Sequence, residues 1–316
     1  MSGVVAGIDI GGTNAVLGLC DKNGTVLCET ALKTNDYPEF ESFVNAASKQ
    51  ISQMLEKTGA NLLGIGIGAP NANYSRGTIE HAVNLPWGGG IIPIAEKFKE
   101  KLGVEVKITN DANATAVGEK VFGGAKNTDN FVVLTLGTGL GGGIFVNGQL
   151  LYGHSGFAGE IGHILLVPNG RTCGCGQKGC AEAYVSATGI CRTAFELLAE
   201  HREDSCLRKF SYNDLTSKII AESAKNGDKI ALRAFEKTAE YLGRVIADSV
   251  AVLSPQKFFL FGGLANAGDI LLAPAKVFAK SFVLENMRES FDVEISQIPE
   301  ANAAVLGAAA LIWEKL

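Results

Sequence analysis

Two glycine-rich turns, each between two apolar strands, constrain the fold of this chain more than any other feature. Residues 4–10 form an apolar run that predicts a buried strand, "GGTN" predicts a turn, and residues 15–20 predict its partner strand. The segment "FVVLTLGTGLGGGIFVNGQL", residues 131–150, repeats this order. Alternating strands and helices are predicted after each copy. The repeated order predicts a duplicated α/β fold.

The length of the chain favours two domains. Its 316 residues are more than one average hydrophobic core fills. We expect a smaller N-terminal α/β domain over residues 1–111, with residues 301–316 packing back on it, and a larger C-terminal α/β domain over residues 112–300. The cleft between two such halves is a natural place for a ligand.

Charge and hydropathy exclude several classes of protein. The net charge is −5 and no block of Lys or Arg occurs, which argues against a nucleic-acid-binding surface. No run of eighteen apolar residues predicts a membrane span. The apolar N-terminus lacks the basic residues of a secretory signal before Lys22 and contains Asp9. We therefore expect a cytoplasmic protein, whose thiols stay reduced.

The glycine clusters do not have the context of the common nucleotide motifs. "GTGLGG" at residues 137–142 fits the dinucleotide pattern G-x-G-x-x-G, but a strand follows it, where that motif requires a helix. No G-x-x-x-x-G-K-[ST] motif occurs. A strand-turn-strand loop can still bind phosphate through consecutive backbone N–H groups. One such loop would be an ordinary turn, but three, two of them in matching positions, favour phosphate binding: Gly11, Gly12 and Thr13; Thr138 and Gly139; Gly262 and Gly263.

A histidine and three cysteines form a cluster with the pattern H-x₉-C-x-C-x₄-C. One nitrogen and three thiolates suit tetrahedral Zn²⁺, and a site closed by four protein ligands is structural. A redox pair is the alternative, although no C-x-x-C occurs; a loop of unmetalled thiols is another. The remaining cysteines, at positions 20, 28, 191 and 206, are expected to be small buried hydrophobes. The four predicted zinc ligands are His163, Cys173, Cys175 and Cys180.

Five segments, taken in order, resemble a known family. They are "DIGGTN" at 9–14, "NDAN" at 110–113, "LGTGLGGG" at 136–143, "GEIGH" at 159–163 and "CGCGQKGCAE" at 173–182. They are similar to the sugar kinases of the ROK family (repressors, open reading frames, kinases), which belong to the superfamily of actin, heat-shock chaperones and hexokinases. The resemblance implies a two-domain, duplicated actin-like or hexokinase-like (ribonuclease H-like) ATPase fold with a cleft between the domains.

The resemblance also implies where the nucleotide binds. ATP would lie between the two domains, with its phosphates on the loops at 11–13 and 138–139 and its adenosine near 262–263. Mg²⁺ would be held by the nucleotide and, through water, by Asp9.

Phosphoryl transfer to a sugar hydroxyl requires a group that accepts the hydroxyl proton. Asp111 follows the predicted strand "VEVKITN" and opens a helix, a position where α/β sheets present side chains to ligands. Its alternative role is to cap that helix, which Asn110 could do instead. By resemblance, Asp111 is the general base and Asn110 contacts the sugar.

The family resemblance assigns the sugar to residues around the cysteine cluster. A histidine that binds metal through one ring nitrogen can present the other to a ligand, which is the role implied for His163. Glu160 and Glu182 would accept hydrogen bonds from sugar hydroxyls. The alternative for both carboxylates is a solvated surface position.

The combined prediction is an ATP-dependent hexose kinase that phosphorylates the 6-hydroxyl, with glucose as the first substrate and glucose 6-phosphate as its product. N-acetylglucosamine, N-acetylmannosamine, mannose and fructose are the alternatives within the family. A noncatalytic regulatory protein that binds sugar or ATP is the alternative of another class. Because the first phosphate loop begins at Asp9, we expect no DNA-binding module like that of the family's repressors ahead of it. We expect a homo-oligomer, a dimer or a tetramer, without nucleic-acid or membrane partners.

Overall fold

The computed structural model describes residues 2–299 and 302–316, and these divide into two compact units. Unit 1 comprises Met1–Asn127, Leu150–Ala158 and Gln297–Leu316, and unit 2 comprises Thr128–Gln149 and Gly159–Ser296. Each unit combines a five-stranded sheet with helices, so the predicted α/β class is confirmed. The domain limits predicted from the sequence, 1–111 with 301–316 and 112–300, stay predictions.

The sheet of unit 1 has the strand order β3-β2-β1-β4-β8. Its first three strands are antiparallel neighbours, whereas β4 and β8 continue the sheet in parallel to β1. A small second sheet has the order β5-β6-β7. The strands are β1 (Gly3–Ile10), β2 (Asn14–Cys20), β3 (Val26–Lys33), β4 (Asn61–Gly68), β5 (Ala72–Asn73), β6 (Thr78–Glu80), β7 (Ile91–Ile92) and β8 (Glu105–Thr109).

The second five-stranded sheet repeats this arrangement with the order β11-β10-β9-β12-β13. Again a hairpin comes first, with β10 antiparallel to β9, and β12 and β13 then follow in parallel. The repeated order confirms the duplication that the two glycine-turn hairpins predict. The strands are β9 (Phe131–Leu136), β10 (Leu140–Val146), β11 (Gln149–Leu150), β12 (Lys257–Phe261) and β13 (Asp292–Ile295).

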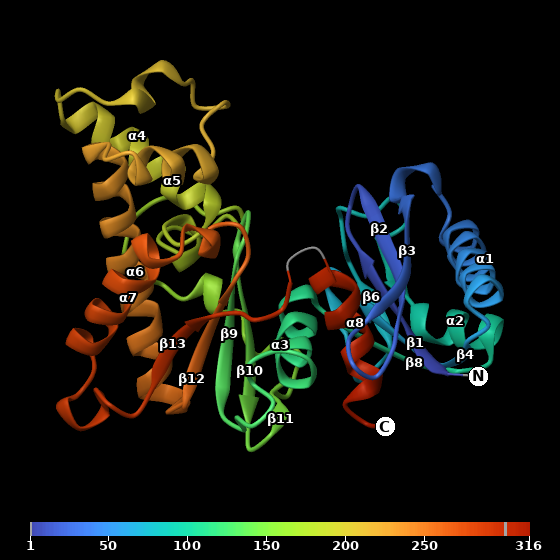
Figure 1. Ribbon diagram of the computed structural model, residues 1–316. Coiled ribbons are helices and arrows are strands. Elements are labelled where there is room, and N and C mark those ends of the chain that lie inside the picture. The colour runs from blue at the N-terminus through green and yellow to red at the C-terminus, as the bar shows by residue number, and fades with distance from the viewer. Residues whose placement is uncertain (1, 300–301) are drawn as a thin grey trace. The chain divides into compact units, whose positions relative to one another are not determined.

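Helices cover the sheets within each unit (Figure 1). In unit 1, α1 and α2 lie on one face of the sheet and α8 lies on the other. In unit 2, α6 and α7 pack against each other beside the sheet. The helices are α1 (Phe40–Thr58), α2 (Ile94–Leu102), α3 (Asp111–Val121), α4 (Ala187–Glu200), α5 (Ser217–Lys225), α6 (Lys229–Leu253), α7 (Asp269–Phe282) and α8 (Ala303–Trp313).

Glycines in two central strands let the last helix lie directly on the sheet of unit 1. A Cβ at Gly66 would lie 1.7 Å from the carbonyl oxygen of Ala308, and one at Gly7 would lie 2.1 Å from that of Val305. The sequence of α8, "AAVLGAAALIW", is apolar all round, as expected for a buried helix. Small residues on both elements therefore determine how closely helix and sheet approach.

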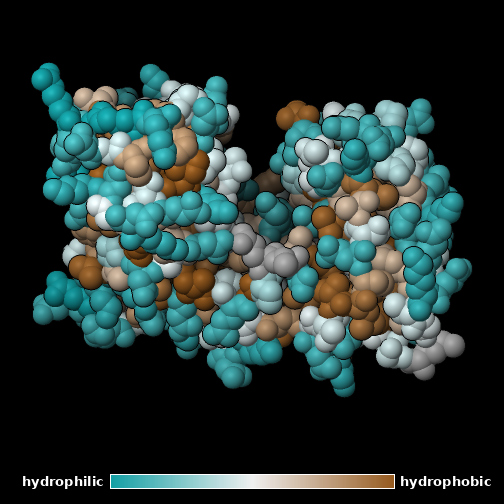
Figure 2. Space-filling view, turned by 45° about the horizontal axis from the view of Figure 1, so that its top comes forward, coloured by the Kyte–Doolittle hydropathy of each residue, from teal (hydrophilic) through white to brown (hydrophobic). Residues whose placement is uncertain are grey.

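The face of the molecule drawn in Figure 2 is mostly polar. Figure 2 shows hydrophilic side chains over most of the visible face of both units, with smaller apolar areas between them. Among the described helices, none combines the length and the apolar character that a membrane crossing requires.

The expectation that the four cysteines outside the cluster are buried is only partly correct. Cys20 and Cys191 are buried and Cys28 is half-buried, but Cys206 is exposed. The backbone N–H of Cys206 donates to the Asp228 carboxylate at 2.7 Å, in a short helical turn at the surface. That polar anchor keeps Cys206 outside the core, so its prediction was wrong.

We predict that Gly66→Ala destabilises unit 1 strongly, because the added methyl group meets backbone rather than a movable side chain. Forcing the helix away from the sheet is expected to lower the free energy of unfolding by about 3 kcal/mol. Urea denaturation measures this change. Gly89→Ala is the control, since its Cβ has no neighbour within 4 Å. Equal stability of the two variants would contradict the proposed packing constraint.

Candidate active site and metal centre

The first glycine loop connects β1 to β2 in unit 1 and is held by a buried threonine. The Thr34 hydroxyl donates to the carbonyl oxygen of Gly11 at 2.8 Å, and the Thr34 N–H donates to that of Thr13 at 2.9 Å. The Gly11 N–H donates to the Asn14 carbonyl at 2.9 Å and closes the turn. Thr34 lies twenty-three residues beyond Gly11 and belongs to no motif, so this role was not predicted from the sequence.

Two of the predicted carboxylates interact within unit 1. Asp9 is the penultimate residue of β1, and Asp111 is the first residue of α3. Burial, and secondly the negative charge of Asp111, raise the pKa of Asp9 from 3.8 to about 6. Such a carboxylate is predisposed to take a cation or a proton.

Asn110 caps α3, so Asp111 is not needed for that role. The Asn110 side-chain oxygen accepts from the Asn113 N–H at 2.8 Å. Asp111 is exposed, and one of its carboxylate oxygens accepts from the N–H of Ala112 at 2.9 Å. The Asn113 amide group is buried and has no hydrogen-bond partner among the described residues. Capping by Asn110 leaves the second carboxylate oxygen of Asp111 available to a ligand.

The second glycine loop, residues 137–140, connects β9 to β10 in unit 2. Its Gly137 N–H donates to the Gly139 carbonyl at 3.1 Å, which makes a tight turn. Thr138 is exposed at its tip. Because Gly139 lacks a side chain, the Glu182 carboxylate can lie against the loop: a Cβ at Gly139 would be 2.2 Å from Glu182 Oε2. That oxygen accepts from the N–H of Leu140 at 3.1 Å.

The third loop follows β12 and also belongs to unit 2. Gly262 has φ +101° and lies against the backbone of Leu136. The Leu264 N–H donates to the Leu136 carbonyl at 3.0 Å, so this loop is attached to the strand that leads into the second loop. Gly263 is exposed, and a Cβ there would meet nothing within 4 Å. At the paired glycines, the backbone of Gly263 is therefore accessible at the surface.

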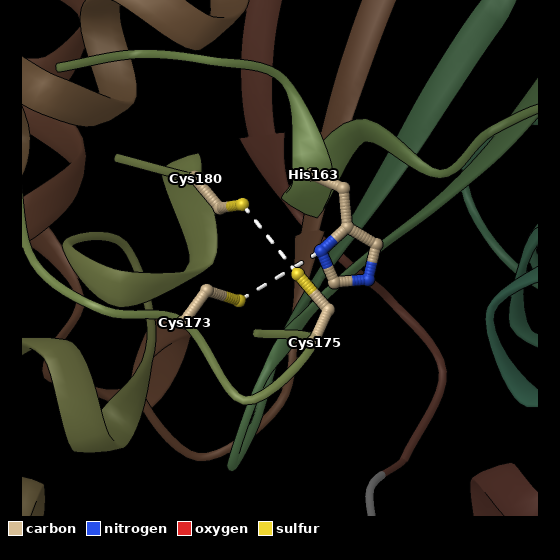
Figure 3. Close-up of side chains that lie close together, drawn as sticks. All are labelled: His163, Cys173, Cys175 and Cys180. Carbon is tan, nitrogen blue, oxygen red and sulfur yellow. Dashed lines mark hydrogen bonds between the residues drawn. The ribbon is translucent and has the colours of Figure 1, made fainter. Parts of the chain in front are cut away.

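The four predicted metal ligands lie together (Figure 3). Their ligand atoms all lie within 4.8 Å of one another. Cys175 Sγ is 3.7 Å from Cys180 Sγ, and Cys173 Sγ is 3.8 Å from His163 Nδ1. A tetrahedral site with Zn–S bonds of about 2.3 Å has ligand-to-ligand edges of roughly 3.6–3.8 Å. The donor set and these two distances therefore fit a tetrahedral zinc site.

The three thiols of the cluster differ in pKa in the absence of a bound cation. Hydrogen bonding from the Gln177 N–H lowers the pKa of Cys175, whereas burial raises that of Cys173 to about 12 and also raises that of Cys180. A dication favours the thiolate forms, so metal binding would release protons from the buried thiols.

The two ring nitrogens of His163 face different surroundings. Figure 3 shows its Nδ1 facing the cysteines, with Nε2 on the far side of the ring. Nε2 lies 3.9 Å from Glu160 Oε2, and both side chains are exposed. The geometry thus agrees with a ring that gives one nitrogen to the metal and offers the other to a ligand.

A cavity of about 290 Å³ in unit 2 adjoins the metal cluster and the second glycine loop. Cys173 and Glu182 line it, together with Thr138 of the loop and Thr188 and Arg192 of α4. Thr188 and Arg192 were not predicted, because a single Thr or Arg on a helix does not by itself indicate a binding site.

The structure divides the predicted site residues between the units. Unit 1 contains Asp9, Gly11, Gly12, Thr13, Asn110 and Asp111. Unit 2 contains Thr138, Gly139, Glu160, His163, Cys173, Cys175, Cys180, Glu182, Gly262 and Gly263. Within unit 2, the metal ligands, Glu182 and the second glycine loop are brought into contact.

Comparison with known proteins extends over almost the entire chain. The chain is 35% identical to a glucokinase of Halalkalibacterium halodurans, over 98% of this chain and 94% of that enzyme. It is 31% identical to the xylose repressor of Bacillus subtilis, over 98% of this chain and 77% of the repressor. A crystal structure of a ROK family glucokinase from Streptomyces griseus, in complex with glucose and AMPPNP, is 33% identical with a TM-score of 0.79 and coverage of 98% of both chains.

These similarities confirm the predicted actin-like, hexokinase-like fold class. The family model described as the ROK family matches residues 5–315, which is nearly the full length. Because the family model covers nearly the whole chain, and the glucokinase of Halalkalibacterium halodurans is 35% identical over 98% of it, this chain belongs to the ROK family.

Proposed function

We propose that this protein is an ATP-dependent hexose kinase that transfers the γ-phosphoryl group of ATP to the 6-hydroxyl of glucose. The observation that carries this proposal is the capping of α3 by Asn110, which leaves Asp111 with an exposed carboxylate beside half-buried Asp9. Full-length similarity to glucokinases at 35% identity supports glucose as the substrate.

Asp111 acts as the general base in this proposal. Its free carboxylate oxygen accepts the proton of the sugar 6-hydroxyl as the hydroxyl oxygen attacks the γ-phosphorus, and ADP leaves with the electron pair of the broken P–O bond. The N–H groups of the loops at 11–13 and 138–139 bind the phosphates, and Gly262 and Gly263 border the adenosine. Mg²⁺ bound to the nucleotide, with Asp9 as a ligand through water, would neutralise the charge that develops on the phosphates.

The proposed contacts to the acceptor sugar are polar side chains. Asn110 and Asp111 come from unit 1, and Glu160, His163 and Glu182 come from unit 2. Carboxylates and an imidazole nitrogen can form directional hydrogen bonds with hydroxyls, and such contacts discriminate strongly between sugars. Zinc at His163, Cys173, Cys175 and Cys180 is structural, because all four of its positions are taken by protein.

Two further expectations accompany this function. Reduced thiols in the zinc site suit the cytoplasm as the compartment. A homo-oligomer, dimer or tetramer, is the expected assembly.

The substrate proposal is tested by measuring ADP release with Mg-ATP and a panel of glucose, mannose, fructose, N-acetylglucosamine and N-acetylmannosamine. The largest kcat/KM is expected with glucose. Asp111→Asn should lower kcat by about 10²–10⁴-fold while thermal stability is retained, because Asn110 caps the helix. Asp36→Asn, an exposed carboxylate of unit 1, is the control. An active Asp111→Asn variant would exclude this residue as the base, and wild-type protein inactive with every sugar would exclude the kinase.

Asp9 predicts a pH dependence of stability in the absence of nucleotide and metal. Its pKa is raised on folding from 3.8 to about 6, so the folded state binds the proton more tightly than the unfolded state. Ionised Asp9 therefore destabilises the fold above about pH 6, and this penalty disappears as the pH falls from 6 toward 4. Asp9→Asn should be more stable than wild type at pH 8, with the advantage declining below pH 6. Urea unfolding across this range measures it, and parallel stability curves would contradict it.

Metal analysis tests the zinc site. We expect one zinc ion per chain, and Cys175→Ser is expected to lose it and to unfold at lower temperature, because metal binding contributes to folding free energy. Cys206→Ser is the matched control, since Cys206 is also exposed but lies outside the cluster. Wild-type protein purified without zinc and equally stable with added chelator would show that the cluster is not a structural metal site.

A further inference from the structure

One segment of unit 2 connects the metal cluster to the second glycine loop. This connecting segment, residues 181–188, begins directly after the metal ligand Cys180 and ends in the first turn of α4. It contains a short helical turn, Ala181–Ala183, and the α4 cap Ser186. It lies between the Cys₃His cluster, which is the proposed structural zinc site, and the second glycine loop, which is proposed to bind phosphate.

The connecting segment makes three hydrogen bonds to the 137–140 loop. The Glu182 carboxylate accepts from the Leu140 N–H at 3.1 Å. The Ala187 N–H donates to the Gly137 carbonyl at 2.8 Å, and the Thr188 hydroxyl donates to the Thr138 carbonyl at 3.0 Å. All three bonds go to backbone groups of the loop.

These bonds determine where the N–H groups of the loop point. In a planar trans peptide, the C=O of one residue is antiparallel to the N–H of the next. Holding the Gly137 carbonyl therefore fixes the Thr138 N–H, and holding the Thr138 carbonyl fixes the Gly139 N–H. The bond to Leu140 fixes the third peptide plane. A loop that binds phosphate through its N–H groups needs this orientation before the ligand arrives.

The same segment is tied to the metal cluster at its other end. Cys180 directly precedes it in the chain, so a metal bound by Cys180 would hold its start. Glu182 Oε1 accepts from the Cys173 thiol at 3.3 Å, a bond that metal binding would end by removing the thiol proton. In the cysteine-rich loop, the Arg171 guanidinium donates to the Ala183 carbonyl at 2.9 Å and to the Gly189 carbonyl at 3.1 Å.

The connecting segment itself is well fixed. The Ser186 hydroxyl donates to the Glu182 carbonyl at 2.7 Å and lies 3.0 Å from the Thr188 hydroxyl. Residues 183–186 are buried, and no glycine occurs between positions 181 and 188. A movement of Cys180 or Cys173 would therefore also move Glu182 and Thr188.

We propose that the connecting segment is a positioning element that couples metal binding at the Cys₃His cluster to phosphate binding by the 137–140 loop. The proposal rests on the proposed function for the identity of the phosphate ligand, Mg-ATP. Because coupling between two binding sites is reciprocal, zinc strengthens nucleotide binding and nucleotide strengthens zinc binding by the same factor.

Thr188 provides the sharpest variant, because it belongs neither to the metal ligands nor to the proposed sugar contacts. Thr188→Val keeps the shape and removes the donor to the Thr138 carbonyl. Its dissociation constant for Mg-AMPPNP, measured by calorimetry, is expected to rise about 2- to 10-fold. Thr188→Ser should restore the wild-type value. Zinc content, thermal stability and the KM for glucose should not change.

Thr238→Val is the matched control. Thr238 is a buried threonine of unit 2 whose hydroxyl donates within α6 at 2.8 Å, to Ala234. Its loss removes one hydroxyl hydrogen bond without touching the loop, so nucleotide affinity should remain that of wild type.

The coupling itself is measured by equilibrium competition for zinc with a colorimetric chelator, with and without saturating Mg-AMPPNP. In wild-type protein, nucleotide should lower the apparent dissociation constant of zinc severalfold, and in Thr188→Val the ratio of the two constants should fall toward one. A zinc affinity that does not change with nucleotide in wild type, or a nucleotide affinity that does not change in Thr188→Val, would overturn the proposal. Either result with sugar phosphorylation intact leaves the kinase assignment standing. A wild-type protein that binds no nucleotide overturns the coupling and the kinase assignment together.

Discussion

The proposed phosphate loops contain no Lys or Arg, so phosphate binding there would depend on the orientation of their peptide planes. In unit 1 a threonine hydroxyl from outside the loop, that of Thr34, holds the carbonyl of Gly11. In unit 2 the hydroxyl of Thr188 holds the carbonyl of Thr138. Each fixed carbonyl fixes the N–H of the following glycine, Gly12 or Gly139. The two threonines come from unrelated positions in the chain, so the duplicated hairpins reach the same solution with different supports.

The negative charges of the Asp9 and Asp111 pair in unit 1 are unfavourable before a cation binds. Asp9 is mostly shielded from water and faces the charge of Asp111, which is why its pKa rises. A fold selected only for stability would replace such a pair. Its presence next to the first glycine loop is the arrangement expected where a nucleotide and its cation complete the charge balance.

Local sequence patterns predicted the parts of the site that local physics controls. The glycine turns, the apolar strands of both hairpins and the metal ligand set are each encoded within about twenty residues, so their spacing alone identifies them. Asn110 as a helix cap likewise follows from the preference of Asn for that position.

The supports of the site were not predictable in the same way. Glu182 and Leu140 are 42 residues apart, and Thr188 and Thr138 are 50 apart. No periodicity or motif joins such positions. The same holds for the raised pKa of Asp9, which depends first on burial by the tertiary fold and secondly on Asp111, more than one hundred residues away. The wrong prediction for Cys206 has a related cause: hydrophobicity suggested burial, whereas a hydrogen bond from its backbone to Asp228 keeps it at the surface.

The position of the metal cluster explains why a phosphoryl-transfer protein would retain a closed metal site. Residues 174–178 are exposed and rich in glycine and polar side chains, so this loop cannot bury an apolar core of its own. Four ligands on one ion supply the rigidity that packing cannot supply there. A metal that fixes Cys180 would also fix Glu182, which lies two residues further along the chain and contacts the glycine loop. Such a closed metal site would supply no electrons and no open coordination position; its contribution would be to fix the backbone on which the proposed phosphate recognition depends.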